Sequence, residues 1–170
     1  MVDAIAKEII SRKDYLHDEL ATIYFGGGTP SLLSGPQLEK LLEAIHQNFT
    51  VSSTAEVTLE ANPEDLTKAH SEALYKHGIN RLSIGIQTFD EEKLQWMNRI
   101  HSSEEAVKAF RNARSAGFEN ISLDLIYAIP DHDRNAWEKD LKAITSLDPE
   151  HISLYGLTIE EKTVFGKWER

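Results

Sequence analysis

Apolar residues along the chain change repeatedly between a helical spacing and a strand spacing. Around residues 37–48 they recur at i, i+3, i+4 and i+7, which predicts a helix with one buried side. Around residues 81–87 they alternate with polar or small residues, as in a strand. The same reasoning predicts helices over 2–12, 37–48, 65–77, 90–97, 102–117 and 135–146, and strands over 22–25, 56–60, 81–87, 121–126 and 151–155.

Two of the predicted helix-to-strand joints have similar sequences. Residues 78–82 and 117–121 both run from a glycine through an apolar residue and an asparagine into a strand. They are part of a repeating unit in which strands alternate with helices along the chain. This alternation predicts a parallel sheet with helices outside it, either doubly wound or part of a (β/α) barrel. Because a complete barrel takes about 250 residues, 170 residues favour a partial barrel.

Cysteine is absent from the sequence. This excludes disulfide bonds, thiolate nucleophiles, cysteine-ligated zinc and cysteine-ligated iron-sulfur clusters. A chain of this length buries a core without such crosslinks. Any chemistry must therefore come from other side chains or from a bound molecule.

The net charge of -10 arises from 28 acidic and 18 basic residues. It argues against nucleic acid as a partner, because phosphate-binding surfaces are built from clustered lysine and arginine. The apolar runs are much shorter than the roughly 20 residues that span a bilayer. The first residues also lack the apolar core of a signal peptide. These features predict a cytoplasmic location.

Polar residues and glycines recur at the predicted strand ends, where parallel α/β folds bind ligands. Glycines 26–28 follow the first strand, and without Cβ atoms they let a ligand approach the backbone closely. Glu60 ends the second strand, Gln87 ends the third, and Asp124 lies in the fourth. Together they predict a binding site at one end of the sheet.

Each of these residues also has an ordinary structural interpretation. The glycines could form a sharp turn with positive φ, Glu60 and Asp124 could cap the next loop, and Gln87 could be a satisfied polar residue. Arg99 could pair with a carboxylate, although arginine is more often simply at the surface. His132 lies between two aspartates, but without a zinc-binding spacing it predicts a solvated loop rather than a metal ligand.

Six short segments stand out when they are taken together: GGGTPSLL (26–33), LEANP (59–63), NRLSIGIQ (80–87), NRIH (98–101), LDLIYAIP (123–130) and HISLY (151–155). In this order they closely resemble the radical S-adenosylmethionine family, in the branch of oxygen-independent coproporphyrinogen III oxidase and the haem chaperone HemW. The resemblance extends from about residue 21 to residue 165. It is stronger to the HemW-like members than to true oxidases.

The resemblance implies a partial (β/α) barrel of the radical SAM type, truncated at both ends, with S-adenosylmethionine held at a [4Fe-4S] cluster. It implies no particular catalytic residue. The implied cofactor-binding residues are Gly27, Gly28 and Thr29 at the methionyl end, and Glu60, Gln87, Arg99 and Asp124 on the rest of the cofactor.

The chain departs from the family at the cluster ligands. The family binds its cluster with a Cys-x-x-x-Cys-x-x-Cys loop, and this chain has no cysteine. We therefore expect residues 1–170 to be the central part of a radical SAM core domain, without the cluster-binding strand and loop or the C-terminal domain. The isolated chain should be inactive, and the cofactor and cluster belong to the full-length protein. For that protein, the resemblance implies haem or porphyrin and a haem-acceptor protein as partners.

Two other hypotheses remain open from the sequence. The chain could be a cluster-free α/β enzyme or binding module that uses Glu60 and Asp124 as acid and base on a small substrate. It could also bind partners, or itself, through exposed edge strands. Upstream sequence encoding three cysteines would favour the radical SAM hypothesis over both.

Overall fold

The structure, a computed structural model, describes residues 1–160, 162 and 164–168. Five parallel strands form one sheet in the order β1-β2-β3-β4-β5. Sequential order without a reversal is typical of a barrel rather than of a doubly wound sheet, and it confirms the predicted partial barrel. The strands are β1 (Leu20–Phe25), β2 (Val51–Ala61), β3 (Arg81–Gln87), β4 (Asn120–Tyr127) and β5 (His151–Gly156).

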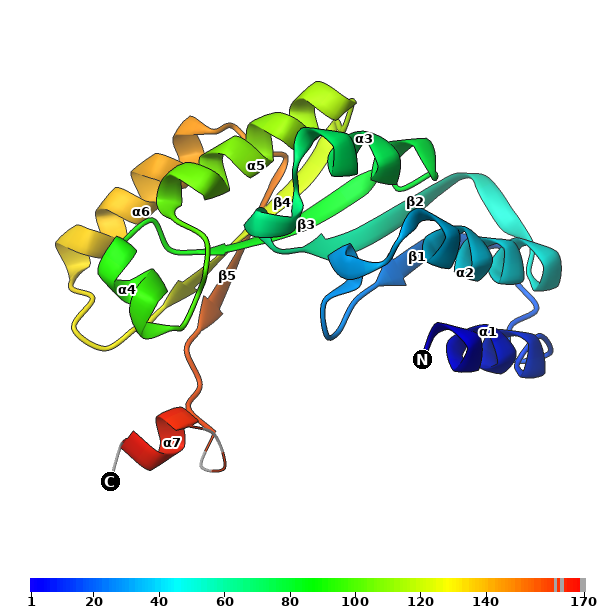
Figure 1. Cartoon of the computed structure of the whole chain (residues 1–170), viewed down its shortest axis with the longest axis horizontal. Coiled ribbons are helices and arrows are strands. Elements are labelled where there is room, and N and C mark those ends of the chain that lie inside the picture. Colours follow the sequence, from blue (N-terminus) through cyan, green and yellow to red (C-terminus); the bar gives the residue numbers. More distant parts are fainter. Residues whose placement is uncertain (161, 163, 169–170) are drawn as a thin grey trace.

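Most of the helices lie along the convex side of the curved sheet, whereas α7 lies apart from them beyond the end of β5, and the concave side is the inside of the half-barrel (Figure 1). Helix α1 packs on α2 at one end, through a small cluster of Ala6, Leu41 and Ala44. The helices are α1 (Val2–Ser11), α2 (Gly35–Asn48), α3 (Lys68–Lys76), α4 (Glu91–Trp96), α5 (Ser103–Ala116), α6 (Arg134–Ser146) and α7 (Val164–Trp168), with short 3₁₀ helices η1 (Pro30–Leu32) and η2 (Pro63–Asp65).

The hydrophobic core lies between the sheet and the helices. Successive side chains of a strand point to opposite faces. In β3, Leu82, Ile84 and Ile86 are fully buried in this core. In β4, the fully buried core residues are likewise alternate ones, namely Ile121, Leu123 and Leu125. The residues between them face the concave side, so one set of strands builds both the core and the site.

The helix ends agree with the capping signals in the sequence, with one exception. Ser102 and Glu105 form the expected capping box of α5, and Gly117 ends that helix with a φ of 106°. The helix expected over 65–77 is wrong at its start. Residues up to Asp65 form η2 instead, and α3 begins after Thr67, whose side chain accepts a hydrogen bond from the His70 N–H.

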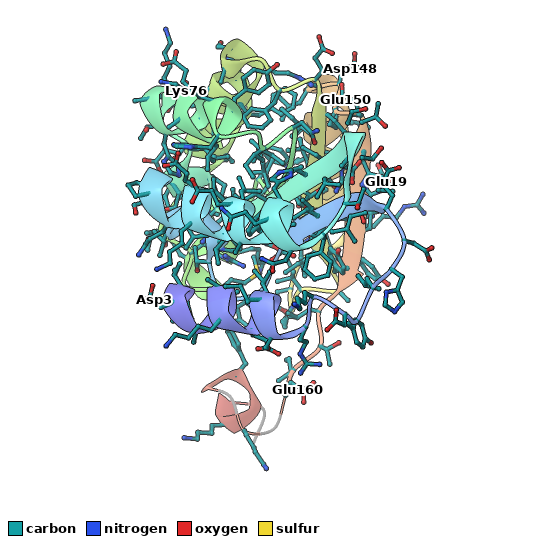
Figure 2. The ribbon with its side chains drawn as sticks, turned by 90° about the vertical axis from the view of Figure 1, so that its right-hand side faces the viewer. Asp3, Glu19, Lys76, Asp148, Glu150 and Glu160 are labelled. Atoms are coloured by element: carbon teal, nitrogen blue, oxygen red, sulfur yellow. The ribbon has the colours of Figure 1, made fainter. Side chains whose placement is uncertain are left out.

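Acidic side chains lie around the periphery of the molecule. Figure 2 shows Asp3, Glu19 and Asp148 at the outer edge of the view, and all three are exposed. Within the part of the chain that the structure describes, no helix combines the length and apolar character needed to cross a bilayer.

Candidate functional site

A cavity of about 240 Å³ lies at the carboxyl ends of the strands on the concave side. It brings together candidates from four separate strand ends, since Gly28, Thr29, Glu60, Gln87 and Asp124 all line it. The other lining residues are Pro30, Ser31, Ala61, Asn62, Ser83, Gly85 and Tyr155. Most of these contribute polar side chains or open backbone, so the cavity suits a polar ligand.

The glycine loop after β1 is shaped by two left-handed residues. Gly27 has a φ of 80° and Gly28 a φ of 65°, so the turn interpretation is correct for both. No heavy atom lies within 4 Å of the position a Cβ would take at either glycine. Gly26 is needed for another reason, because its Cβ would lie 2.6 Å from Cε1 of Tyr24. The loop therefore combines a required backbone shape with open space beside it.

Glu60 connects β2 to this loop rather than capping the loop that follows it. Its Oε2 accepts a hydrogen bond from the Gly27 N–H at 2.9 Å, and its Oε1 accepts one from the Tyr24 hydroxyl at 2.8 Å. Desolvation of that hydroxyl, together with the bond to Glu60, raises the pKa of Tyr24 to about 12. Glu60 therefore holds the glycine loop against the sheet.

Asp124 lies on the concave face of β4 and is partly buried. Its carboxylate accepts hydrogen bonds from the hydroxyls of Ser83, at 3.0 and 3.2 Å, and of Ser122, at 3.3 Å. Desolvation raises the pKa of Asp124, and the negative charge of Glu60 acts in the same direction. The serine hydroxyls oppose this shift because they stabilise the carboxylate. The Asp124 carboxyl group is therefore held in place by neutral hydroxyl donors.

Gln87 stands at an irregular end of β3. The register of β3 against β4 shifts between Gly85 and Gln87, and Gln87 has a φ of 73°. A Cβ on Gly85 would lie 2.5 Å from Nε2 of Gln87, so the glycine leaves room for the amide. The strand end thus directs a polar side chain along the cavity.

Arg99 does not line the cavity. Its Nη1 donates a hydrogen bond to Oδ1 of Asn62 at 3.4 Å, and Asn62 is a lining residue. Arg99 therefore contacts a residue of the cavity lining without being part of that lining. Its contact with the cofactor remains a prediction.

The expectation of a solvated loop at His132 is wrong. Its side chain is 1% exposed, and Nε2 lies 3.5 Å from Oδ2 of the buried Asp140. The loop folds back on α6, which the flanking aspartates did not indicate. No group of three histidine, aspartate or glutamate residues that could hold a metal ion occurs among the described residues.

Sequence reasoning missed Ser83, Asn62 and Tyr155 as lining residues. Ser83 was available from the strand pattern, because it is the polar residue between the apolar Leu82 and Ile84. Asn62 directly follows the end of β2. Tyr155 had no local signal, since its place in the cavity depends on how far the sheet curves.

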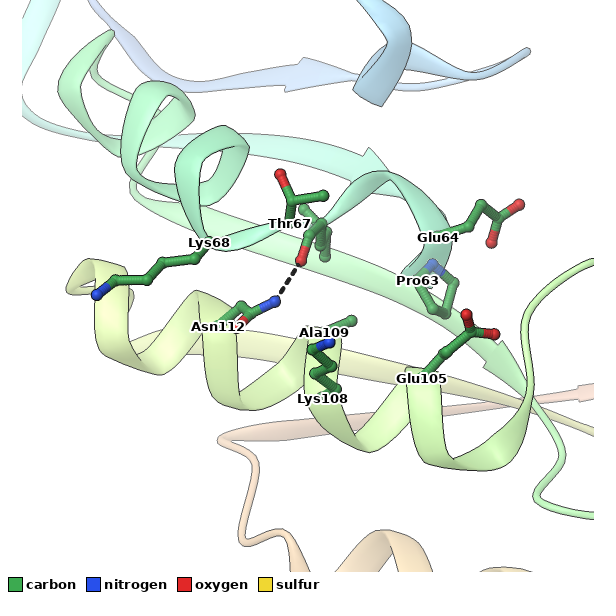
Figure 3. Close-up of a pocket in the computed structure, with 9 residues that line it drawn as sticks. Pro63, Glu64, Thr67, Lys68, Glu105, Lys108, Ala109 and Asn112 are labelled. Carbon is green, nitrogen blue, oxygen red and sulfur yellow. Dashed lines mark hydrogen bonds between the residues drawn. The ribbon is translucent and has the colours of Figure 1, made fainter.

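A second cavity, of about 350 Å³, lies on the outer side between η2, α3 and α5 (Figure 3). The Asn112 amide donates a hydrogen bond to the Leu66 carbonyl across it at 2.8 Å. Its charged lining residues are two glutamates and two lysines, Glu64, Glu105, Lys68 and Lys108. Their charges balance, and none of the candidate residues lies there.

The fold and the pocket define a partial parallel (β/α) barrel with a ligand site at the carboxyl ends of its strands. Comparison with known sequences identifies the family to which this barrel belongs. The profile of the Radical SAM superfamily matches residues 2–144. The chain therefore belongs to this superfamily, as the sequence motifs predicted.

Within the superfamily the chain is HemW-like. It is 42% identical to the heme chaperone HemW of Escherichia coli over 148 residues, which is 87% of this chain and 39% of that protein. It is 38% identical to HemW of Lactococcus lactis over 170 residues, covering 99% of this chain and 45% of the relative. The chain thus spans less than half the length of these relatives.

Solved structures show the same fold. Coproporphyrinogen III oxidase (HemN) from Escherichia coli, a radical SAM enzyme, superposes with a TM-score of 0.87 at 28% identity, over 98% of this chain and 38% of that one. An archaeal Elp3 superposes with a TM-score of 0.76 at 20% identity, over 98% of this chain and 44% of that one. The second likeness supports the fold alone.

Proposed function

We propose that the concave cavity is the S-adenosylmethionine site of a HemW-like protein, and that residues 1–170 are the central part of its radical SAM core domain. One observation carries the proposal. Gly28, Thr29, Glu60, Gln87 and Asp124, which come from four separate strand ends, line a single cavity. These are residues that the family resemblance implies for the cofactor.

The chemistry of the cavity fits this ligand. S-adenosylmethionine carries an ammonium group, a sulfonium and ribose hydroxyls, and the carboxylates of Glu60 and Asp124 can accept hydrogen bonds from such groups or attract their charge. The open backbone at Gly27 and Gly28 leaves space for the methionyl end. The volume of about 240 Å³ is below the range of roughly 300–1,000 Å³ for small-molecule sites. It therefore suits part of the ligand.

The chain's own residues would bind and orient the ligand. Asp124 is already held by Ser83 and Ser122, so its carboxyl group is in place before a ligand arrives. Glu60 keeps the glycine loop in position through the Gly27 N–H. Gln87 adds an amide that can donate or accept a hydrogen bond.

A [4Fe-4S] cluster does not fit this chain, because such clusters are held by cysteine thiolates and the chain has none. We propose that the chain alone is inactive. For the full-length protein we propose haem or porphyrin as the bound molecule and a haem-acceptor protein as the partner. The proposal is supported by the relatives that are named heme chaperones.

We also propose that the sheet edges mediate self-association. Among the described residues, β1 and β5 each pair with one neighbouring strand, so each leaves one edge for another chain. Light scattering at increasing concentration should show mass growth. A constant monomer mass would contradict this part of the proposal.

A second candidate function rests on the two carboxyl groups that line the cavity, Glu60 and Asp124. The pKa of Asp124 is raised, chiefly by desolvation and further by the charge of Glu60. Paired carboxyl groups in different environments can act as acid and base on a small substrate. This candidate requires a cavity that is complete without a cluster. The affinity for S-adenosylmethionine separates this candidate from the cofactor site proposed first.

Nuclear magnetic resonance can test the proposed site directly. Adding millimolar S-adenosylmethionine should shift the amide signals of Gly28 and the side-chain amide of Gln87. Glu60→Gln should reduce these shifts, while Glu39→Gln, an exposed glutamate on α2, should leave them unchanged. Shifts confined to the outer cavity near Lys68 would contradict the proposal.

A further inference from the structure

The end of β3 holds a strained turn. The Thr88 N–H donates to the Ile86 carbonyl at 3.0 Å, and Gln87 between them has a φ of 73°. A bond from residue i+2 back to residue i across a positive φ defines a γ-turn of the rare, strained type. A residue other than glycine keeps such a conformation only where its surroundings enforce it. The structure should therefore contain groups that hold Gln87 in place.

His101 lies on one side of this turn. Its side chain is fully buried, and its Nε2 lies 3.2 Å from the Ile86 carbonyl oxygen. A carbonyl oxygen can only accept, so Nε2 carries the hydrogen of this bond. On the other side of the ring, Nδ1 lies 3.1 Å from Oε2 of Glu64. The ring therefore has a polar neighbour at each nitrogen, and the Nε2–H holds the carbonyl that closes the γ-turn.

Asp140 lies on the other side of the turn. It is 2% exposed and belongs to α6. Its Oδ2 accepts a hydrogen bond from the Thr88 hydroxyl at 2.6 Å, and its Oδ1 accepts one from the Phe89 N–H at 2.9 Å. The residues before and after Gln87 are therefore held by two buried groups, His101 from the segment between α4 and α5 and Asp140 from α6.

The segment that carries Arg99 shares this anchor. The Arg99 N–H donates to the Leu94 carbonyl at 2.9 Å, and Asn98 before it has a φ of 55°. His101, two residues after Arg99, is buried, whereas Ile100 between Arg99 and His101 is 79% exposed. His101 therefore fixes one end of the Arg99 segment while it also holds the turn at Gln87.

We propose that His101 and Asp140 are positioning residues of the cofactor site, which hold the Gln87 γ-turn from its two sides. The inference rests on the proposed function, because it assigns these residues to the same cavity. Neither residue lines the cavity, so they act through Gln87 and the Arg99 segment. Nothing in the local sequence around either residue indicates this role.

Two matched substitutions of His101 isolate the hydrogen bond from its Nε2 to the Ile86 carbonyl. The amide nitrogen of glutamine can take the place of histidine Nε2, whereas that of asparagine can take the place of Nδ1. In His101→Gln, the backbone carbon shifts of Gln87 should keep their left-handed values. In His101→Asn they should move toward ordinary strand values. The initial slope of the Gly28 shift with S-adenosylmethionine should then fall by about tenfold, as expected for one lost hydrogen bond.

Two further measurements separate positioning from general destabilisation. Leu74→Ala removes a buried side chain of α3, away from the turn, and should lower stability without changing the Gln87 shifts. Long-range nitrogen–proton spectra of the wild-type ring should show a protonated Nε2. If His101→Asn does not fold, Asp140→Asn provides the same readout. The new side-chain amide nitrogen is itself a donor, so it would lose the hydrogen bond from either the Thr88 hydroxyl or the Phe89 N–H.

The outcomes are distinct. Unchanged Gln87 shifts and an unchanged Gly28 slope in a folded His101→Asn variant would overturn the inference, as would an unprotonated Nε2. If the wild-type chain shows no response to S-adenosylmethionine, the proposed function fails. The ligand-free Gln87 shifts would still decide whether His101 holds the turn.

Discussion

The two faces of the sheet are built from the same strands, but the convex face packs against the core and the concave face lines the cavity. On the convex face, Leu123 of β4 is fully buried against the helices, within one continuous apolar core. On the concave face, its neighbour Asp124 faces a cavity and is held by serine hydroxyls. One strand thus supplies burial on one side and fixed polar groups on the other, through the twofold alternation of its side chains.

The difference shows how this fold separates stability from binding. Burying a polar group without a partner costs free energy, so ligand-binding groups collect on the face that the helices do not cover. Changes on the convex face should therefore act mainly on unfolding, and changes on the concave face mainly on ligand binding.

The largest effect should come from the convex face. Leu123→Ala deletes a fully buried side chain and should lower the free energy of unfolding by about 2–5 kcal/mol. Ser122→Ala is its matched control, because Ser122 is equally buried and adjacent but faces the other way. It should cost only about 0.5–1.5 kcal/mol. Urea unfolding measures both, and equal losses would contradict the division between faces.

A backbone change in the glycine loop should have the next largest effect. Gly28→Ala places a side chain at a φ of 65° and should cost roughly 1 kcal/mol or more in stability. Gly85→Ala is the comparison, since its new Cβ meets the flexible end of Gln87 instead. It should cost less stability but displace the Gln87 amide. Thermal unfolding and the Gln87 side-chain signal report the two effects.

Asp124 should make stability depend on pH in a defined direction. Its folded pKa is raised above the ordinary value of 3.8, so the protonated form is favoured in the folded state. The advantage is fully present below pH 3.8 and is lost as the pH rises through the folded pKa. The unfolding free energy of the wild type, relative to Asp124→Asn, should therefore fall over that window. A difference that rises with pH would show that the serine hydrogen bonds outweigh desolvation.

The smallest effect at neutral pH should come from Tyr24, whose pKa is about 12. Ultraviolet titration should show one tyrosine ionising near that value. Any stability linked to its raised pKa is present below its ordinary value of 10 and is lost between pH 10 and 12. Glu60→Gln should move this ionisation to lower pH. No change in that variant would mean that Glu60 does not hold the hydroxyl.

Local patterns predicted most of the fold. The bounds of β3, residues 81–87, follow directly from alternation, and the capping box at Ser102 marks the start of α5. The predicted start of α3 at residue 65 was wrong because Thr67, whose side chain accepts a hydrogen bond from the His70 N–H, caps the helix, so that α3 begins at Lys68. A helix or strand that has a repeated apolar spacing can be predicted from the sequence. The residue at which a helix begins is harder to predict, because several neighbouring residues can act as the N-cap.

The site was predictable only in part. Glu60 and Gln87 could be named because strand ends of a parallel sheet meet at one edge. The groups that hold them could not. His101 reaches the Ile86 carbonyl across 15 residues, and Asp140 reaches Thr88 across 52. The burial of His132 depends on the same packing against α6. Such contacts arise from tertiary structure and leave no local pattern.

The affinity for S-adenosylmethionine tests the central claim most directly. The retained hydrogen bonds are each worth about 0.5–3 kcal/mol, whereas association costs on the order of 4–15 kcal/mol in lost freedom. Calorimetry should therefore give a Kd no tighter than roughly millimolar, which corresponds to about -4 kcal/mol. Micromolar affinity that Asp124→Ala or Glu60→Ala abolishes would contradict the account. The cavity would then be complete without a cluster, and a cluster-free enzyme or binding module would replace the radical SAM proposal.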